Sequence, residues 1–324
     1  MNKTQLIKDS IRRFSHLSSR SIARYILMNY GNEYFDNDLE KIRGRVRYFR
    51  GKSGKTHKDS LADKSLIPDK PLKMPKTWVK DRPPYKLKAG LWGIMPDVHV
   101  PFHQPKPIEA AIQEFQKEKV DGILLLGDFQ DCAAVSWWKQ AQRKFSKELE
   151  LSIDMLDFIR GEFPDAMIVY KPGNHEYRLP NYYVTHAPEL VESPVAAMEA
   201  VIGFEERNIE FLDYLQMVFA GKLPLIHGHE IRLTSRAVNP ARGLSLKAKT
   251  FCACAHFHTT SQHTTKNLLG EDITTWSFGC LCDLNPDFYP YGNEWNHGFG
   301  IINIEDNGDF EVINRRVLPS GDVV

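Results

Sequence analysis

The chain has 324 residues, of which 42% are hydrophobic and 26% charged, and its formal net charge is +1. This is an ordinary globular composition for one large domain and a small one, and no apolar run approaches the roughly 18 residues that cross a bilayer. The N-terminal segment MNKTQLIKDSIRRF has no signal-peptide core and the five cysteines do not suggest a secreted disulfide framework, so we expect a cytoplasmic protein with reduced thiols and no membrane contact.

The small net charge conceals a division within the chain. Residues 1–90 contain 22 Lys and Arg against 9 Asp and Glu, whereas residues 91–324 contain 20 against 32. Such asymmetry indicates a basic module for a polyanion beside a domain with a different task. We expect a basic helical module at 1–58, a Lys- and Pro-rich linker that is mobile or lies along the surface at 59–88, and a larger domain at 89–324.

Residues 4–50 have the pattern of three short helices. Ser18-Ser19 and Asn37-Asp38 are the expected N-caps of the second and third helices, and Gly31 and Gly51 are expected to end them. The apolar residues of the third helix recur at helical spacing and should face a core: Leu39, Ile42, Val46 and Phe49.

The basic residues of the third helix should lie largely on its opposite side. There they could bind nucleic-acid phosphates: Lys41, Arg43, Arg45, Arg47 and Arg50. The alternatives are a solvated basic face or one docked on the acidic domain, and the similarity of the three helices to a helix-turn-helix is weak.

From Leu91 onward, short apolar runs alternate with helical stretches, which predicts an α/β domain. Six runs have the length and flanking residues of buried strands: 91–95, 122–126, 166–170, 217–220, 223–226 and 251–255. Helices are expected at 106–119, 146–162 and 194–203. The pair Asn307-Gly308 predicts a hairpin near the end of the chain.

Five of these strands end in residues that can bind a metal ion. The ends contain Asp97-x-His99, Asp128-x-x-Asp131, Asn174-His175-Glu176, His227-x-His229 and His256-x-His258. One such pair alone is more often an ordinary surface or core pair than a ligand set. Five in this order can converge on one cleft, because ligands in open α/β sheets bind at the carboxyl ends of the strands. Imidazole, carboxylate and amide ligands without thiolate favour Mn²⁺, Fe or Zn²⁺.

In the order and spacing of these motifs, the chain resembles the calcineurin-like metallophosphoesterases over about residues 90–285. The resemblance implies a four-layer α/β/β/α sandwich and two divalent metal ions, with Mn²⁺ favoured over Fe, Zn²⁺ and Ni. It implies that the first ion is held by Asp97, His99, Asp128 and His258. The second would be held by Asp128, Asn174, His227 and His256, with Asp128 bridging the two.

The resemblance also implies a catalytic role for His175. A hydroxide bridging the ions would attack phosphorus, and His175 would protonate the leaving oxygen or stabilise charge there, with its tautomer fixed by Asp131. Glu176 is expected to support the loop. His229 is the alternative to His227 as a ligand.

Several further residues have open roles. Arg178 could reach a substrate phosphate or form an ordinary surface ion pair, and His103 could contact substrate or lie in a solvated loop. Ala255 stands where the family has glycine, which puts the tightness of that turn in doubt.

The aromatic loop 287–291 could stack bases or cover the cleft. Two Cys-x-Cys pairs could hold a structural Zn²⁺, although buried small hydrophobes are favoured: Cys252, Cys254, Cys280 and Cys282.

The expected function is metal-dependent hydrolysis of a phosphoester. The basic module favours a phosphodiesterase or nuclease acting on nucleic acid or nucleotides, similar to nucleases of DNA-break repair and to proteins carried by tailed phages. The alternatives are a monoesterase for small molecules or phosphoproteins and an inactive nucleic-acid-binding scaffold. Cys132-Ala133, in place of the Arg-Gly of phosphoprotein phosphatases, argues against a protein phosphatase, and the intact ligand set argues against a scaffold. The sequence predicts no particular oligomeric state.

Overall fold

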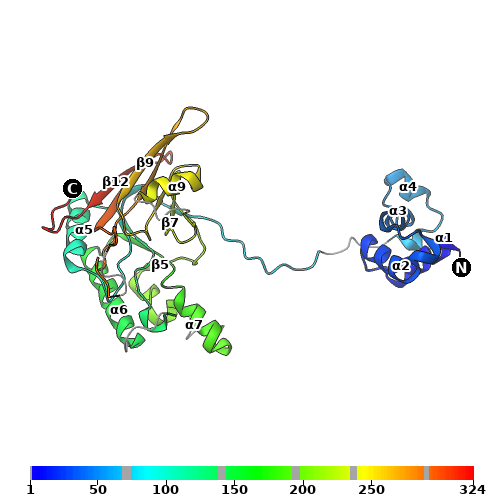
Figure 1. Cartoon of the computed structure of the whole chain (residues 1–324), viewed down its shortest axis with the longest axis horizontal. Coiled ribbons are helices and arrows are strands. Elements are labelled where there is room, and N and C mark those ends of the chain that lie inside the picture. Colours follow the sequence, from blue (N-terminus) through cyan, green and yellow to red (C-terminus); the bar gives the residue numbers. More distant parts are fainter. Residues whose placement is uncertain (1, 68–73, 138–143, 192–197, 234–238, 288–291) are drawn as a thin grey trace. The chain divides into compact units, whose positions relative to one another are not determined.

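The computed structural model describes residues 2–67, 74–137, 144–191, 198–233, 239–287 and 292–324. The chain divides into two compact units, Met1–Lys80 and Asp81–Val324 (Figure 1). Within the described ranges, no helix combines the length and the apolar character that a bilayer span requires.

The first unit is a small helical bundle. Its helices are α1 (Lys3–Arg13), α2 (Ser19–Tyr34), α3 (Leu39–Phe49) and α4 (Lys55–Ser60), followed by a 3-10 turn at Lys64–Leu66. The predicted N-caps are confirmed, since the side chain of Ser18 accepts a hydrogen bond from the amide of Ser21, and that of Asp38 from the amide of Lys41. Leu66 packs into the bundle core, so this part of the expected linker is structured.

Gly31 does not end the second helix, and that expectation is wrong. Helix α2 continues to Tyr34, and the amide of Phe35 still donates to the carbonyl of Gly31. Phe35 is buried in the bundle core, so its packing outweighs the cost of about 1 kcal/mol that glycine imposes on a helix interior.

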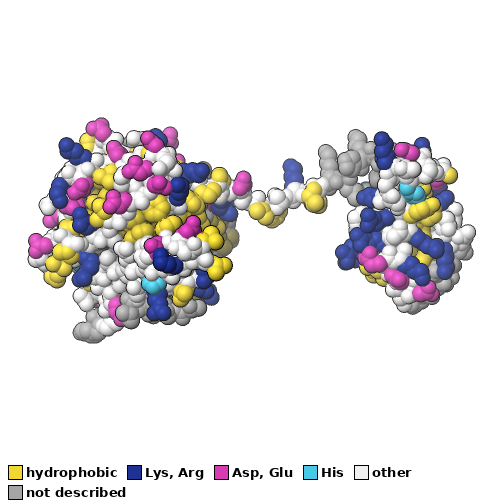
Figure 2. Space-filling view, turned by 90° about the horizontal axis from the view of Figure 1, so that it is seen from above, with side chains coloured by type: hydrophobic (Ala, Val, Ile, Leu, Met, Phe, Trp, Pro, Cys, Tyr) yellow, Lys and Arg dark blue, Asp and Glu magenta, His cyan; other side chains and the backbone are white. Residues whose placement is uncertain are grey.

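The apolar face of α3 packs inward as expected. Ile42 and Val46 are fully buried. Lys41, Arg45 and Arg47 are exposed, while Arg43 is partly exposed and pairs with Glu40. Figure 2 shows Lys and Arg side chains gathered on the visible face of this unit.

Arg50 corrects the expectation for the basic face. Its side chain is buried, with Nη1 donating to the carbonyl of Leu17 at 2.7 Å and Nη2 to that of Ser15 at 2.9 Å. The residue sits at the C-cap of α3, and its long side chain reaches the turn between α1 and α2. Arg50 therefore stabilises the packing of α3 against the turn between α1 and α2, and its side chain is not available to a nucleic acid.

The second unit contains two six-stranded sheets. The first has the order β12-β11-β2-β3-β4-β5 and the second β1-β6-β7-β8-β10-β9. The strands of the first sheet are β2 (Gly90–Met95), β3 (Gly122–Leu126), β4 (Met167–Lys171), β5 (Ile209–Phe211), β11 (Gly298–Ile304) and β12 (Phe310–Arg316). Those of the second are β1 (Tyr85–Leu87), β6 (Val218–Ala220), β7 (Leu223–Ile226), β8 (Cys252–Cys254), β9 (Ser261–Lys266) and β10 (Asp272–Ser277). Strands β2 to β5 run parallel, as do β7 and β8, so their carboxyl ends share an edge within each sheet.

The helices cover the outer faces of the two sheets. Apolar side chains from both sheets form one cluster, which includes Leu124 and Val169 of the first and Leu225 and Ala253 of the second. Helices α5 (Pro105–Glu118) and α6 (Phe145–Glu162) pack on the other face of the first sheet, and α9 (Pro240–Ala248) packs on the second. Figure 1 shows α5 and α6 on one side of the unit and α9 on the other. This order of layers confirms the α/β/β/α sandwich.

The predicted strands and helices of this unit lie within one or two residues of the observed ones, and β11 and β12 form the predicted hairpin. For the helix expected at 194–203, the described part is α8 (Met198–Ile202), and residues 194–197 lie outside the described residues. The sequence pattern did not indicate β1, β5, β9, β10, α4, α9 or α7 (Arg178–His186).

Candidate metal centre

The five metal-competent strand ends meet where the two sheets adjoin. Asp97 and Asp128 follow strands of the first sheet, and His227 and His258 follow strands of the second. Nε2 of His227 lies 3.1 Å from Oδ2 of Asp128, and Nε2 of His258 lies 3.2 Å from Oδ1 of Asp97. Residues far apart in the sequence thus form a single buried cluster.

The cluster contains two groups of ligand atoms that share Asp128. Atoms of Asp97, His99 and Asp128 lie within 4.8 Å of one another, and so do atoms of Asp128, His227 and His256. Nε2 of His258 adjoins the first group, 3.3 Å from Nε2 of His99. This geometry permits the sharing of one carboxylate between two ions.

Oδ1 of Asn174 is buried and forms no hydrogen bond; Nε2 of His227 and Oδ1 of Asp97 lack a well-aligned one, although their ion-pair partners lie 3.1 and 3.2 Å away. Buried polar atoms are nearly always hydrogen-bonded, so each exception requires an explanation. All three are oxygen or imidazole nitrogen atoms of the kind that bind Mn²⁺, Fe or Zn²⁺. The residues present therefore fit divalent metal ions.

The backbone at the cluster adopts an uncommon conformation. Five residues have φ between 47° and 69°: Asp97, His99, Asp128, His256 and His258. Non-glycine residues seldom occupy this region, and they concentrate at functional sites, where the surrounding structure holds them in place. At the turn after β8 the positive φ falls on His256, so Ala255 does not need the freedom of glycine.

Two glycines leave room for the cluster. A Cβ atom on Gly127 would lie 2.3 Å from Nδ1 of His227, and one on Gly173 would lie 2.3 Å from Oδ1 of Asp128. Any larger residue at these positions would push a ligand side chain aside.

Charges within the cluster shift its titration strongly. Burial lowers the pKa of His227 and His258, but the adjacent Asp128 and Asp97 outweigh it and raise the pKa of each histidine to about 9. Burial, together with the neighbouring His227, lowers the pKa of His256 to about 4. The surrounding histidines hold the pKa of Asp128 well below its ordinary value, despite its burial. Without metal, the cluster thus holds protons that a cation would replace.

Asp131 joins His175 to the cluster. Its Oδ1 lies 2.9 Å from Nδ1 of His175 and 2.9 Å from Nδ1 of His99. Since a carboxylate only accepts hydrogen bonds, both imidazoles carry a proton on Nδ1. Nη2 of Arg178 lies 2.9 Å from Nε2 of His175, and Nη1 donates to the carbonyl of Asp131. Arg178 is thus placed beside His175, in a partly buried position.

Glu176 supports the loops, as the sequence predicted. Its buried carboxylate accepts hydrogen bonds from the amides of Asp128, Gln130 and Gly173 and from the hydroxyl of Tyr170. One side chain thereby holds the ends of β3 and β4 together.

A second supporting pair was not predicted. Lys171 is fully buried, with its Nζ 3.2 Å from Oε1 of Glu230, and Oε2 of Glu230 accepts from the amide of Gly228 at 2.7 Å. The pair fixes the turn after β7, in which His227 is buried and His229 is partly exposed beside Glu230. The one signal in the sequence was a lysine at the end of an apolar strand.

The other candidates have different surroundings. His103 forms an isolated β-bridge with Cys282 and is partly exposed. The four strand cysteines are buried and free, and among the described residues no group of three or more metal-competent side chains is made of cysteines alone. Of the aromatic loop 287–291, residues 288–291 lie outside the described residues.

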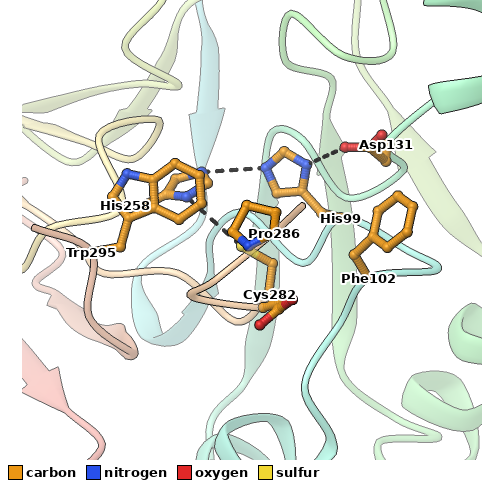
Figure 3. Close-up of a pocket in the computed structure, with 8 residues that line it drawn as sticks. His99, Phe102, Asp131, His258, Cys282, Pro286 and Trp295 are labelled. Atoms are coloured by element: carbon orange, nitrogen blue, oxygen red, sulfur yellow. Dashed lines mark hydrogen bonds and ion pairs between the residues drawn. The ribbon is translucent and has the colours of Figure 1, made fainter. Parts of the chain in front are cut away.

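A small hollow of about 20 Å³, which opens to solvent, adjoins the first group of ligands. His99, Asp131 and His258 form part of its lining, and Phe102, Pro286 and Trp295 add apolar surface (Figure 3). The ring of Trp295 packs on His258, with 4.2 Å between the ring centroids.

Relatives of the chain occur in mycobacteriophages, which confirms the expected similarity to phage proteins. The Gene 54 protein of Mycobacterium phage D29 is 23% identical over 228 residues, covering 66% of this chain and 89% of that protein. The Gene 54 protein of Mycobacterium phage L5 is 22% identical over 226 residues, covering 65% and 88%. No family model matches the chain.

Similar solved structures are more distant. Vps29 of Chaetomium thermophilum has a TM-score of 0.35 and 16% identity, covering 73% of this chain and 94% of that one. Yfce, a phosphoesterase from E. coli, has a TM-score of 0.31 and 12% identity, covering 69% and 98%. At these values neither structure indicates what this chain binds or cleaves.

Proposed function

We propose that the chain is a two-metal phosphoesterase, and that its substrates are phosphodiesters in nucleic acid or nucleotides. The observation that carries the proposal is that two groups of possible ligand atoms, one with Asp97 and His99 and one with His227 and His256, share the buried carboxylate of Asp128.

The first group of ligands would be Asp97, His99, Asp128 and His258, and the second would be Asp128, Asn174, His227 and His256. Bound there, two divalent ions would activate water as the nucleophile and offset the charge that develops on the phosphoryl oxygens. Mn²⁺ is the first choice, with Fe, Zn²⁺ and Ni as alternatives.

His175 and Arg178 would act on the substrate. With Nδ1 hydrogen-bonded to Asp131, His175 directs Nε2 toward the guanidinium of Arg178. Movement of Arg178 onto a substrate phosphate would free this nitrogen to take a proton from solvent and then pass that proton to the leaving oxygen. Asp131 would stabilise the charged imidazole while it carries that proton.

The diester preference rests on the charge of the helical module. Exposed Lys41, Arg45 and Arg47 lie on one helix, in a region with a large excess of basic residues. Such a surface would concentrate a polyanion near the catalytic domain. We propose a nucleic-acid-binding module at 1–58, a linker at 59–88 of which Leu66 packs in the helical bundle and β1 (Tyr85–Leu87) in the second sheet, and a metallophosphoesterase domain at 89–324.

Hydrolysis assays of the full chain test this proposal. We expect Mn²⁺-dependent cleavage of bis-p-nitrophenyl phosphate at a higher kcat/KM than of p-nitrophenyl phosphate, and cleavage of DNA or RNA in the same conditions. The matched variants are Asp128→Asn, which should abolish turnover, and Asp309→Asn, a surface residue that should not affect it. Predominant monoester cleavage with no action on nucleic acid would overturn the substrate assignment. Absence of any turnover would overturn the proposal that the protein is a phosphoesterase.

A further inference from the structure

We infer that Cys282 positions His258 for metal binding, by accepting a hydrogen bond from the imidazole on its sulfur. The inference rests on the proposed function and adds to the first group of ligands a residue that orients a ligand without binding the ion. It also gives a role to a member of the Cys280-x-Cys282 pair.

The two nitrogens of His258 face different neighbours. Nε2 lies 3.2 Å from Oδ1 of Asp97 and 3.3 Å from Nε2 of His99, whereas Nδ1 lies 3.7 Å from Sγ of Cys282. Figure 3 shows the ring of His258 between His99 and Cys282. A metal ion among the candidate ligands would therefore bind Nε2, and a neutral ring bound in this way keeps its proton on Nδ1. The sulfur is then the acceptor for that proton.

The two other buried imidazoles of the cluster are held in the same way, but by oxygen. Nδ1 of His99 lies 2.9 Å from Oδ1 of Asp131, and Nδ1 of His227 lies 2.9 Å from the carbonyl of Leu126. Metal-binding histidines nearly always use their second nitrogen for such a bond, which fixes the tautomer and the direction of the ring. A thiol supplies the corresponding partner at His258.

The surrounding backbone holds Cys282 in place for this contact. Its carbonyl lies 2.9 Å from Nε2 of His297, and the residue forms an isolated β-bridge with His103. The neighbouring thiol of Cys280 adjoins that of Cys282, and its Sγ lies 3.7 Å from the carbonyl of Asn296. Because Cys282 is buried and its backbone is fixed, its sulfur can restrict the orientation of the imidazole.

Direct binding of the sulfur to the ion is the alternative. Sγ of Cys282 belongs to a group in which atoms of His99 and His258 also lie within 4.8 Å of one another. The hydrogen bond, however, places the sulfur at Nδ1 of His258, whereas Asp97 and His99 lie at Nε2. The sulfur and the ion would thus lie on different sides of the imidazole.

Binding of Mn²⁺ to the full-length protein tests the inference, because loss of a positioning bond should weaken one ion only. We expect the wild type to bind two ions, and Cys282→Ala to lower the affinity for one by about 10- to 100-fold while the other stays within about twofold. Cys282→Ser, which keeps an acceptor, should restore most of the affinity. The double variant with Cys280→Ala should lose at least as much, since the neighbouring thiol can no longer replace the missing one.

Cys252→Ala is the matched control. Cys252 and Cys282 are each 3% exposed, so both substitutions remove a buried thiol at a similar cost in stability. The sulfur of Cys252 has the carbonyl of Ala253 as its hydrogen-bond partner, at 3.9 Å. The thermal midpoint in EDTA should therefore fall similarly in both variants, while only Cys282→Ala changes the affinity for Mn²⁺.

Unchanged affinity for Mn²⁺ in both Cys282→Ala and the double variant would overturn the inference. Equal weakening of the two ions would also overturn it, since that result indicates a general loss of structure. A thiolate-to-cobalt absorption band in the Co²⁺-loaded wild type that disappears in Cys282→Ala would identify the sulfur as a ligand, and so contradict a positioning role.

NMR of the imidazole nitrogens in the metal-free protein separates this inference from the proposed function. The Nδ1 signal of His258, assigned by its loss in His258→Gln, should shift in Cys282→Ala and not in Cys252→Ala. If the wild type shows this dependence but binds no Mn²⁺, the proposed function alone fails. If the wild type binds two ions but the signal does not respond to Cys282→Ala, the inference alone fails.

Discussion

Nδ1 of His175 lies 2.9 Å from Oδ1 of Asp131, and the same oxygen lies 2.9 Å from Nδ1 of His99. One carboxylate thus orients both the candidate proton donor and a candidate metal ligand. A partner of this kind fixes the tautomer and the orientation of each ring.

Replacement of Asp131 by Asn should therefore impair two steps at once. An amide can donate to Nδ1 and so permit the wrong tautomer. We expect kcat to fall by about 10²- to 10⁴-fold and Mn²⁺ affinity by about 10-fold or more, with secondary structure unchanged by circular dichroism. Asp309→Asn is the surface control. Turnover within about twofold of wild type would remove Asp131 from the mechanism.

The binding of metal should depend on pH through His227 and His258. Each has a pKa of about 9 in the metal-free cluster, so near pH 7 both hold protons that an ion must displace. Affinity for Mn²⁺ should rise with pH from 7 to about 9 and then level off. Titration calorimetry in buffers of different ionisation enthalpy should show proton release at pH 7, and none would contradict the assignment of these ligands.

The same histidines give the metal-free protein an opposite pH dependence of stability. A pKa that is raised on folding stabilises the fold below the unfolded value of about 6.5, and this contribution is lost as pH rises to about 9. The thermal midpoint in EDTA should fall across this window, while the increase caused by Mn²⁺ should grow. A midpoint in EDTA that rises over this range would count against the protonated cluster.

Gly173→Ala tests how closely the loop after β4 holds Asp128. The added Cβ would lie 2.3 Å from Oδ1 and 2.6 Å from the amide nitrogen of Asp128, and backbone cannot move aside as a flexible side chain can. Displacement of a reacting group by about 1 Å costs on the order of 10²-fold in rate. We expect a loss of this size in kcat, whereas Gly161→Ala, where a Cβ meets nothing within 4 Å, should be silent.

Nucleic-acid binding by the helical module should be electrostatic and confined to its exposed basic residues. In the full-length protein, replacing Lys41, Arg45 and Arg47 by Gln should weaken binding to DNA and reduce the slope of log K against log salt by up to about 3. Lys266→Gln, on an exposed strand of the other unit, is the control. Wild-type binding that is unaffected by salt would refute the predicted role of the module.

The order of the layers and the meeting of the candidate ligands at one edge were predictable, because both follow from short-range patterns in the sequence. Buried parallel strands are continuous apolar runs, and their carboxyl ends carry the polar residues that must meet. Strand β9 was missed because its sequence, SQHTTK, is largely exposed and lacks an apolar pattern.

Contacts between distant segments were not predictable in the same way. Helical periodicity places Arg50 at the end of a basic face, but the reach of its side chain to Ser15 and Leu17 depends on how α1 and α2 pack. The pairing of Lys171 with Glu230 likewise joins the two sheets through residues that share no local motif. In both cases the partner of a charged group is set by tertiary structure alone.

The most direct test of the account is a crystal of the protein grown with Mn²⁺ and measured at the manganese absorption edge. We expect two anomalous peaks about 3.5 to 4 Å apart, with the carboxylate of Asp128 between them and His227 and His258 bound to different ions. A single peak that does not touch Asp128, or no peak within the cluster, would contradict it.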